Sequence, residues 1–196
     1  MKKGIVIFCL SLLAIEATNA QTFTVDGSEI GIDLAFSAST NGGNVGLGLK
    51  YGFNIGEYLI LGPSVRYERL WWKNNYLGYQ GGYNIWGGGA FVHARFFNAL
   101  FIGTEFEMLK TPYPKSGPFG GATLGGSWAP TLLIGGGFSM EFNETFRVNA
   151  GIMYDIIDAP NSPFQSSYMN TTTSTGAQKR VPVFYRLAFF FPIGRE

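Results

Sequence analysis

Between residues 29 and 191, the sequence falls into eight short runs in which large apolar side chains alternate with small or charged ones. A period of two places the apolar set on one face of a β-strand and the other set on the opposite face. A run of about ten residues is long enough for a tilted strand to cross a bilayer. The pattern therefore predicts eight strands, at residues 30–37, 45–54, 59–68, 86–96, 100–108, 128–139, 146–155 and 183–191.

The connections between these runs alternate in length. Short turns lie at residues 55–57, 97–99 and 141–144, whereas long connections lie at 73–83, 111–127 and 159–180. Short turns at one end and long loops at the other are typical of barrels in the outer membrane. We therefore expect an all-β fold, an eight-stranded antiparallel up-and-down transmembrane barrel with short periplasmic turns and longer extracellular loops.

The first twenty residues have the pattern of a secretory signal. Lys2 and Lys3 precede an apolar run from Ile5 to Ile15, and Ala20 supplies a small residue for cleavage. Eleven apolar residues are too few for a transmembrane helix. The prediction is a cleaved signal peptide at 1–20 and a barrel domain at 21–196, with a retained N-terminal anchor as the alternative. Cys9, the sole cysteine, would leave with the signal, so no disulfide is expected.

Charge and composition narrow the class of protein. Without Lys2, Lys3 and Glu16, the 14 basic and 13 acidic residues become 12 of each, which argues against a nucleic-acid partner. Only 14% of residues are charged, against about a quarter in soluble domains. A soluble lipocalin-like barrel with its apolar face inward is the alternative, but its exterior would be mostly Gly, Ser and Ala. The membrane orientation is therefore favoured.

Ten charged residues fall on the small-residue face within the strands. A cation that faces lipid at the bilayer midplane costs about 2–4 kcal/mol, and buried charges persist only when they are paired. Eight strands leave just enough internal room for side chains. We predict a lumen ion-pair network of Asp33, Glu68, Glu105, Glu107 and Asp155 with Lys50, Arg66, Arg95, Arg147 and Arg186.

The other charges sort by end. The long-loop end is basic. The turn end is acidic, with one cation, Arg195, against Asp26, Glu29, Glu57, Glu141, Glu144 and Glu196. The hypothesis is that the basic rim binds the phosphates of lipopolysaccharide in the outer leaflet; the alternative is that solvated loops carry cations by chance. The rim consists of Arg69, Lys73, Lys110, Lys115, Lys179 and Arg180.

Aromatic residues gather near both ends of the predicted strands. Amphipathic rings favour the headgroup level of a bilayer, so two girdles are expected, with ordinary core aromatics as the alternative. The girdles would contain Trp71, Trp72, Tyr83, Trp86 and Trp128 at one end and Tyr58, Phe97, Phe142 and Phe146 at the other.

Two places interrupt the alternation. Pro63 lies inside the third run and lacks a backbone N–H, so a bulge or local irregularity is expected there. The run Gly87–Gly89 has no side chains to define a face, which leaves the register of the fourth strand open by one residue.

The whole mature chain resembles the small eight-stranded outer-membrane barrels of the OmpA/OmpX type, a porin-like barrel family. The resemblance lies in the signal peptide, strand count, lumen charges, loop asymmetry and the aromatic last strand, Phe184–Phe191. Family chains usually stop at an aromatic residue, similar to Phe191, whereas Pro192–Glu196 continue here. The resemblance implies a place in the outer membrane of a Gram-negative-type cell envelope.

No catalytic, metal or cofactor site is predicted. His93 is the only histidine, and without cysteine it has no obvious second metal ligand. Outer-membrane acyltransferases and deacylases resemble one another in placing their histidine toward the outer leaflet, whereas His93 falls near the inner end of its strand. Glu105 and Glu107 could form an acid–base pair, but membership of the lumen network is favoured.

The expected function is therefore non-enzymatic. The barrel would have a structural or surface-interaction role, with the loops at 73–83, 111–127 and 159–180 as its working surface. Expected partners are outer-membrane lipids, including lipopolysaccharide, and an extracellular protein or small-molecule ligand. One alternative is a narrow channel or conduit for small solutes or small apolar molecules, and another is a lipid A-modifying enzyme.

Overall fold

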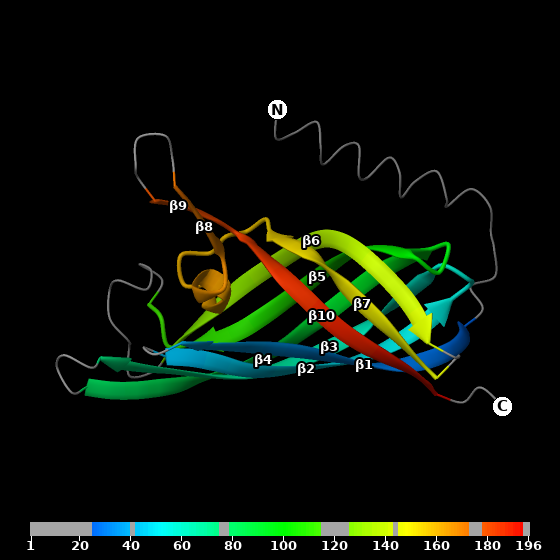
Figure 1. Cartoon of the computed structure of the whole chain (residues 1–196). Coiled ribbons are helices and arrows are strands. Elements are labelled where there is room, and N and C mark those ends of the chain that lie inside the picture. The colour runs from blue at the N-terminus through cyan, green and yellow to red at the C-terminus, as the bar shows by residue number, and fades with distance from the viewer. Residues whose placement is uncertain are drawn as a thin grey trace.

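The computed structural model describes residues 25–39, 42–74, 79–114, 126–142, 145–172 and 178–193, so the predicted signal peptide lies outside the described residues. Eight strands close into one barrel in the order β1-β10-β7-β6-β5-β4-β3-β2, and each neighbouring pair is antiparallel (Figure 1). They are β1 (Val25–Ser39), β2 (Gly42–Ile55), β3 (Leu59–Asn74), β4 (Tyr79–Phe96), β5 (Leu100–Thr111), β6 (Ser127–Phe142), β7 (Phe146–Asp155) and β10 (Val183–Ile193). The all-β, eight-stranded antiparallel fold class is confirmed.

The observed strands extend beyond several predicted boundaries, and two differences change a connection or the last strand. The connection expected at 73–83 is largely strand, because β3 runs to Asn74 and β4 begins at Tyr79. The last strand was expected to end at Phe191, but Pro192 and Ile193 still pair with β1. A hairpin that continues past the barrel wall needs no apolar alternation, so the sequence pattern ends before the strands do.

The connection between β7 and β10 has structure of its own. It contains a 3-10 helix, η3 (Pro163–Ser166), and two short strands, β8 (Met169–Thr172) and β9 (Gln178–Val181), which pair with each other. Figure 1 shows η3 close against the barrel at the loop end, with the β8–β9 hairpin extending outward. Among the described residues, no helix has the length and apolar content needed to cross a bilayer.

The two faces of the strands have the polarity that the alternation predicts. Val65 on the outer face is 57% exposed, and Leu47, Ile152 and Leu187 are also exposed, whereas Glu107 on the inner face is 1% exposed. The soluble-barrel alternative required the opposite arrangement. The barrel therefore presents apolar side chains outward and encloses ionic ones.

The two interruptions of the pattern leave the register intact. The β2–β3 ladder skips the pairs opposite Gly62 and Pro63 and then resumes unchanged, so Pro63 causes a gap in the ladder without a bulge. The register of β4 does not slip either: Phe91 and His93 face inward. The glycine run in β4 serves close packing, since a Cβ on Gly89 would overlap the carbonyl oxygen of Phe106 on β5.

The interior is layered. Near the turn end lies a small apolar cluster of Ile60, Phe91, Ala188 and Phe190. Near the loop end lies a larger one, made of Ile85, Leu109, Leu133, Met153, Phe164, Tyr168 and Phe184. The charged side chains of the strands lie in the lumen together with these two clusters.

Candidate functional site

The lumen holds a layer of six ionised side chains that come from five strands. Asp33 on β1 is its centre: one carboxylate oxygen lies 3.0 Å from Lys50 Nζ and 3.1 Å from guanidinium nitrogens of both Arg66 and Arg186. All four side chains are almost fully buried. Three cations that share one carboxylate require further acids nearby, because an unpaired buried charge is costly.

Two glutamates on β5 supply these acids. Glu107 binds Arg66 through two hydrogen bonds of 2.9 Å in the fork geometry that suits a guanidinium and a carboxylate. Glu105 accepts from Lys50 at 2.6 Å and from Arg186 at 2.6 Å. The ionic layer, defined as Asp33, Lys50, Arg66, Glu105, Glu107 and Arg186, thus holds three acids and three cations.

His93 contacts this layer through Glu105. Its Nε2 lies 2.9 Å from Glu105 Oε1, and its ring packs against Phe91, Phe101 and Phe190. The side chain is 1% exposed. The imidazole is thus enclosed by aromatic rings and shares the carboxylate of Glu105 with Lys50.

The other four predicted lumen charges have hydrogen-bond partners outside this layer. Glu68 accepts a hydrogen bond from Asn44 at 2.6 Å. Asp155 accepts from the Tyr168 hydroxyl and from backbone N–H groups. The expectation that hydrogen bonds join all ten residues in one network is therefore wrong, because these four side chains find partners outside the set.

The remaining two cations, Arg95 and Arg147, bind glutamates that the sequence pattern assigned to the acidic turn end. Arg95 makes two hydrogen bonds of 2.8 Å to Glu29, and Arg147 binds Glu141. Both glutamates lie at even spacing from inward residues, Asp33 and Ser139. That spacing could have identified Glu29 and Glu141 as lumen residues.

A lid closes the loop end over part of the lumen. We define it as residues 159–168, which include η3. Phe164 stacks on Phe184 of β10 with ring centroids 5.0 Å apart, and Tyr168 lies next to the same ring. The Tyr168 hydroxyl donates to Asp155 at 2.6 Å, and burial, with this hydrogen bond, raises the pKa of Tyr168 above its usual value. The connection at 159–180 is thus partly an anchored lid, not only an exposed loop.

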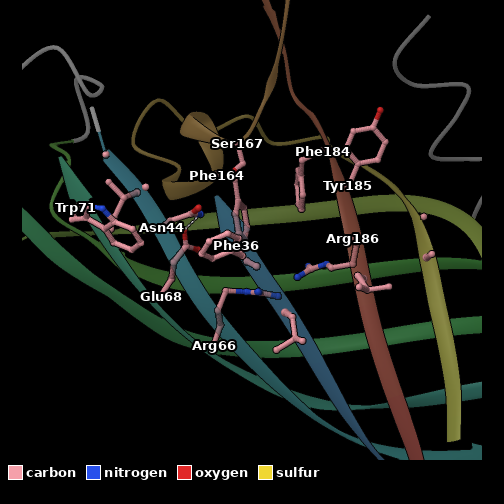
Figure 2. Close-up of a pocket in the computed structure, with 18 residues that line it drawn as sticks. Phe36, Asn44, Arg66, Glu68, Trp71, Phe164, Ser167, Phe184, Tyr185 and Arg186 are labelled. Atoms are coloured by element: carbon pink, nitrogen blue, oxygen red, sulfur yellow. Dashed lines mark hydrogen bonds between the residues drawn. The ribbon is translucent and has the colours of Figure 1, made fainter. Parts of the chain in front are cut away.

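A cavity of about 740 Å³ lies beside the lid, above the ionic layer. Figure 2 shows Arg66 and Arg186 at its base, with Asn44, Glu68 and Trp71 on one side and Phe164 and Phe184 on the other. Its lining also includes outward-facing residues of β1 and β10, among them Phe36 and Tyr185. Sequence reasoning missed this cavity, since it depends on where two strands that are far apart in the chain stop pairing.

A second cavity, of about 500 Å³, lies at the turn end. Its lining is polar and includes the Glu29–Arg95 and Glu141–Arg147 pairs. The ionic layer and the cluster of Ile60, Phe91 and Phe190 lie between the two cavities. The two cavities therefore lie on opposite sides of the ionic layer and this apolar cluster.

The predicted basic rim is found only in part within the described residues. Lys73 and Arg69 are exposed, and Arg69 donates to Asn84. Lys110 lies over the Trp128 ring, and Arg180 binds Gln165 and Asp158. Lys115 and the side chain of Lys179 lie outside the described residues.

The predicted aromatic girdles need one correction. Trp72, Trp86 and Trp128 are exposed at the loop end, as are Tyr58 and Phe97 at the turn end. Tyr83 instead packs inward against the loop-end apolar cluster, and Trp71 lines the larger cavity. Both residues belong to strands that extend beyond the predicted ones, where the alternation was not followed.

Comparison with solved structures gives likenesses in backbone fold. The chain is similar to the outer membrane protein Ail of Yersinia pestis, whose backbone structure was determined in a phospholipid bilayer nanodisc. The two share 14% identity over 85% of this chain and 99% of Ail, with a TM-score of 0.46. No family model matches the chain, and no curated protein matches it.

Breaking the ionic layer should cost more than removing a balanced pair from it. Glu107→Leu leaves Arg66 buried without its main partner, so we expect the free energy of unfolding in detergent, measured by urea titration, to fall by about 3–5 kcal/mol. Adding Arg66→Met restores charge balance and should recover most of this loss. A double variant no more stable than Glu107→Leu would contradict the pairing.

Proposed function

We propose that this chain is an integral outer-membrane barrel with a sealed lumen, which acts as a non-enzymatic structural or surface-interaction protein through its loop end. The observation that carries the proposal is the polarity of the wall. Exposed Leu, Val, Ile and Phe side chains occupy the outer face of all eight strands. An apolar exterior of this extent is far larger than the patches found on soluble monomers.

A barrel also satisfies the backbone requirement of a bilayer. In hydrocarbon each unpaired N–H or C=O costs several kcal/mol, so only helices and closed barrels cross. The closed strand order and the antiparallel ladders supply these hydrogen bonds along most of the wall. A predicted signal peptide at residues 1–20 supports export to a cell envelope of the Gram-negative type.

The sealed lumen favours a structural role over the channel alternative. A conducting pore needs a continuous water-filled path, whereas here the ionic layer and Phe91 and Phe190 fill the middle of the barrel. The environment of His93 also argues against a lipid-modifying enzyme, because its Nε2 already contacts Glu105. Both features support a working surface at the ends of the barrel.

The loop end supplies the surface for partners. The β8–β9 hairpin projects beyond the barrel (Figure 1), and Arg69, Lys73 and Arg180 are exposed there. Cations at this level would meet the phosphates of lipopolysaccharide, and the hairpin would meet an extracellular protein or small-molecule ligand. The lid supports the hairpin from below through Tyr168 and Asp155.

Insertion into a bilayer tests the polarity of the wall. We expect Val65→Arg, which puts a cation on the lipid face near the middle of β3, to reduce the free energy of folding into phosphatidylcholine vesicles by about 2–4 kcal/mol. Val25→Arg, at the end of β1, is the matched control and should cost about 0–1 kcal/mol. Equal behaviour of the two variants would contradict a transmembrane wall.

Planar bilayer recordings test the sealed lumen. Recordings from a single inserted barrel should show no sustained channel openings, because the ionic layer fills the lumen. Sustained, reproducible openings would favour the channel alternative instead.

Lipopolysaccharide association tests the rim. Replacing its six cations with glutamine should weaken binding to lipopolysaccharide vesicles by more than about tenfold at low salt, since each surface cation contributes roughly 1 kcal/mol. The control is neutralisation of Asp26 and Glu57 at the turn end, which should leave binding unchanged. Unchanged binding of the rim variant would refute the role of these cations.

A further inference from the structure

The barrel wall is incomplete where its first and last strands meet. The β1–β10 ladder runs from Ser28–Ile193 to Leu34–Leu187 and stops there. Yet β1 continues to Ser39 and β10 begins at Val183. Beyond Leu34 and Leu187, the described residues of β1 pair only with β2, and those of β10 pair only with β7. Two strand edges therefore face each other across a gap at the loop end.

This gap lies among lipid-facing side chains. Phe36 and Tyr185, on either side of it, are 77% and 74% exposed, and Leu34 and Leu187 mark its lower limit. In hydrocarbon alone, unpaired backbone groups on two open edges would be costly. Polar groups of a bound molecule or water must therefore reach these edges.

The large cavity passes through the gap from one face of the wall to the other. Its lining combines outward-facing Leu34, Phe36 and Leu187 with inward-facing Arg66, Glu68 and Arg186. Figure 2 shows the Arg186 side chain extending from β10 into the space next to β1. The cavity therefore has an apolar mouth toward lipid and a polar base in the lumen.

Two polar atoms at the base lack a partner among the described residues. Asn44 is 6% exposed and Arg186 is 8% exposed, yet Asn44 Oδ1 and Arg186 Nε make no hydrogen bond there. A buried polar group left unpaired costs about 1–3 kcal/mol. Both residues line the cavity, and a small rotation of either side chain would turn its unpartnered atom, which has almost no accessible surface here, toward a bound molecule.

The charges around the base favour an uncharged headgroup. Asp33, Glu105 and Glu107 already neutralise the guanidinium groups of Arg66 and Arg186. Glu68 adds an acid to the same lining. An anionic head would therefore find no unpaired cation, whereas a hydroxyl can donate to Asn44 Oδ1 or accept from Arg186 Nε.

We propose that this cavity binds a single-chain amphiphile with an uncharged, hydroxyl-bearing head, which enters sideways from the outer leaflet between β1 and β10. The inference rests on the proposed transmembrane orientation. The head lies over the ionic layer and the chain passes out between Phe36 and Tyr185. The volume of about 740 Å³ falls within the range of roughly 300–1,000 Å³ for small-molecule sites. Because the ionic layer closes the base, the site retains the molecule and does not pass it through.

A reversible lock on the gap tests the route. If the register continued beyond Leu34–Leu187, Phe36 would lie opposite Tyr185, so Phe36→Cys with Tyr185→Cys can form a disulfide that closes the gap. The matched control is Ile32→Cys with Phe189→Cys, a pair inside the closed part of the ladder. Both double variants of the full barrel are folded into phosphatidylcholine nanodiscs.

The probe is a monoacylglycerol that carries a diazirine next to its headgroup, mapped by mass spectrometry after photolysis. In the reduced lock variant, we expect labelling of the buried inward residues Phe164 and Phe184, competed by unlabelled monoolein. Oxidation should abolish this inward labelling and reduction should restore it. In the control pair, oxidation should have no effect. A lysophosphatidic acid probe of the same chain length should label these residues less.

Several outcomes would overturn the proposal. These are inward labelling that survives oxidation, labelling confined to the outer belt around Val65, or preference for the anionic probe. Labelling of the outer belt also reports insertion of the barrel into the bilayer. If the outer belt is not labelled at all, the proposed function is contradicted, not only entry through the gap. If the disulfide does not form, Ala35→Phe, which fills the cavity from the inner face of β1, should abolish inward labelling, whereas outward Ala90→Phe should not.

Discussion

Pairing of charges inside a space without solvent is the constraint on which the rest of this barrel depends. Asp33, Lys50, Arg66, Glu105, Glu107 and Arg186 come from five strands, and each is almost fully buried. Removing such groups from water costs several kcal/mol per ion unless geometry restores the interaction. The distances of 2.6–3.1 Å between them therefore require a particular register of β1, β2, β3, β5 and β10. The ion pairs in the lumen and the register of the strands in the wall therefore depend on each other.

Alternation was enough to predict the faces of the wall, because burial in a barrel follows strand parity. It left the register open by one residue at Gly87–Gly89, where no side chain defines a face, and the structure resolves it with Phe91 and His93 inward. Parity also applied to Glu29 and Glu141, which were nevertheless assigned by their position near strand ends. The lid, the inward turn of Tyr83 and the choice of partner for each cation could not be predicted, since they depend on contacts between segments far apart in the chain, such as Tyr168 with Asp155.

The layered interior divides the molecule into regions with different tasks. Apolar clusters above and below the ionic layer exclude water from it, which strengthens its interactions and closes the bore. Arg66 connects these levels, since it binds Glu107 below and its guanidinium lies 5.5 Å from the Phe164 ring of the lid. A barrel that is solid in the middle leaves only its rims and its side wall for recognition.

The meeting of β1 with β10 also has a consequence for the order of assembly. Arg186 and Asp33, which join these two strands in the lumen, lie 153 residues apart in the chain. Contacts across such a separation form late, because loop entropy must be overcome before they contribute. During biogenesis, Asp33 therefore gains its third cation, Arg186, only when the last strand pairs with β1. Completion of the cylinder and neutralisation of its interior would then be a single kinetic event.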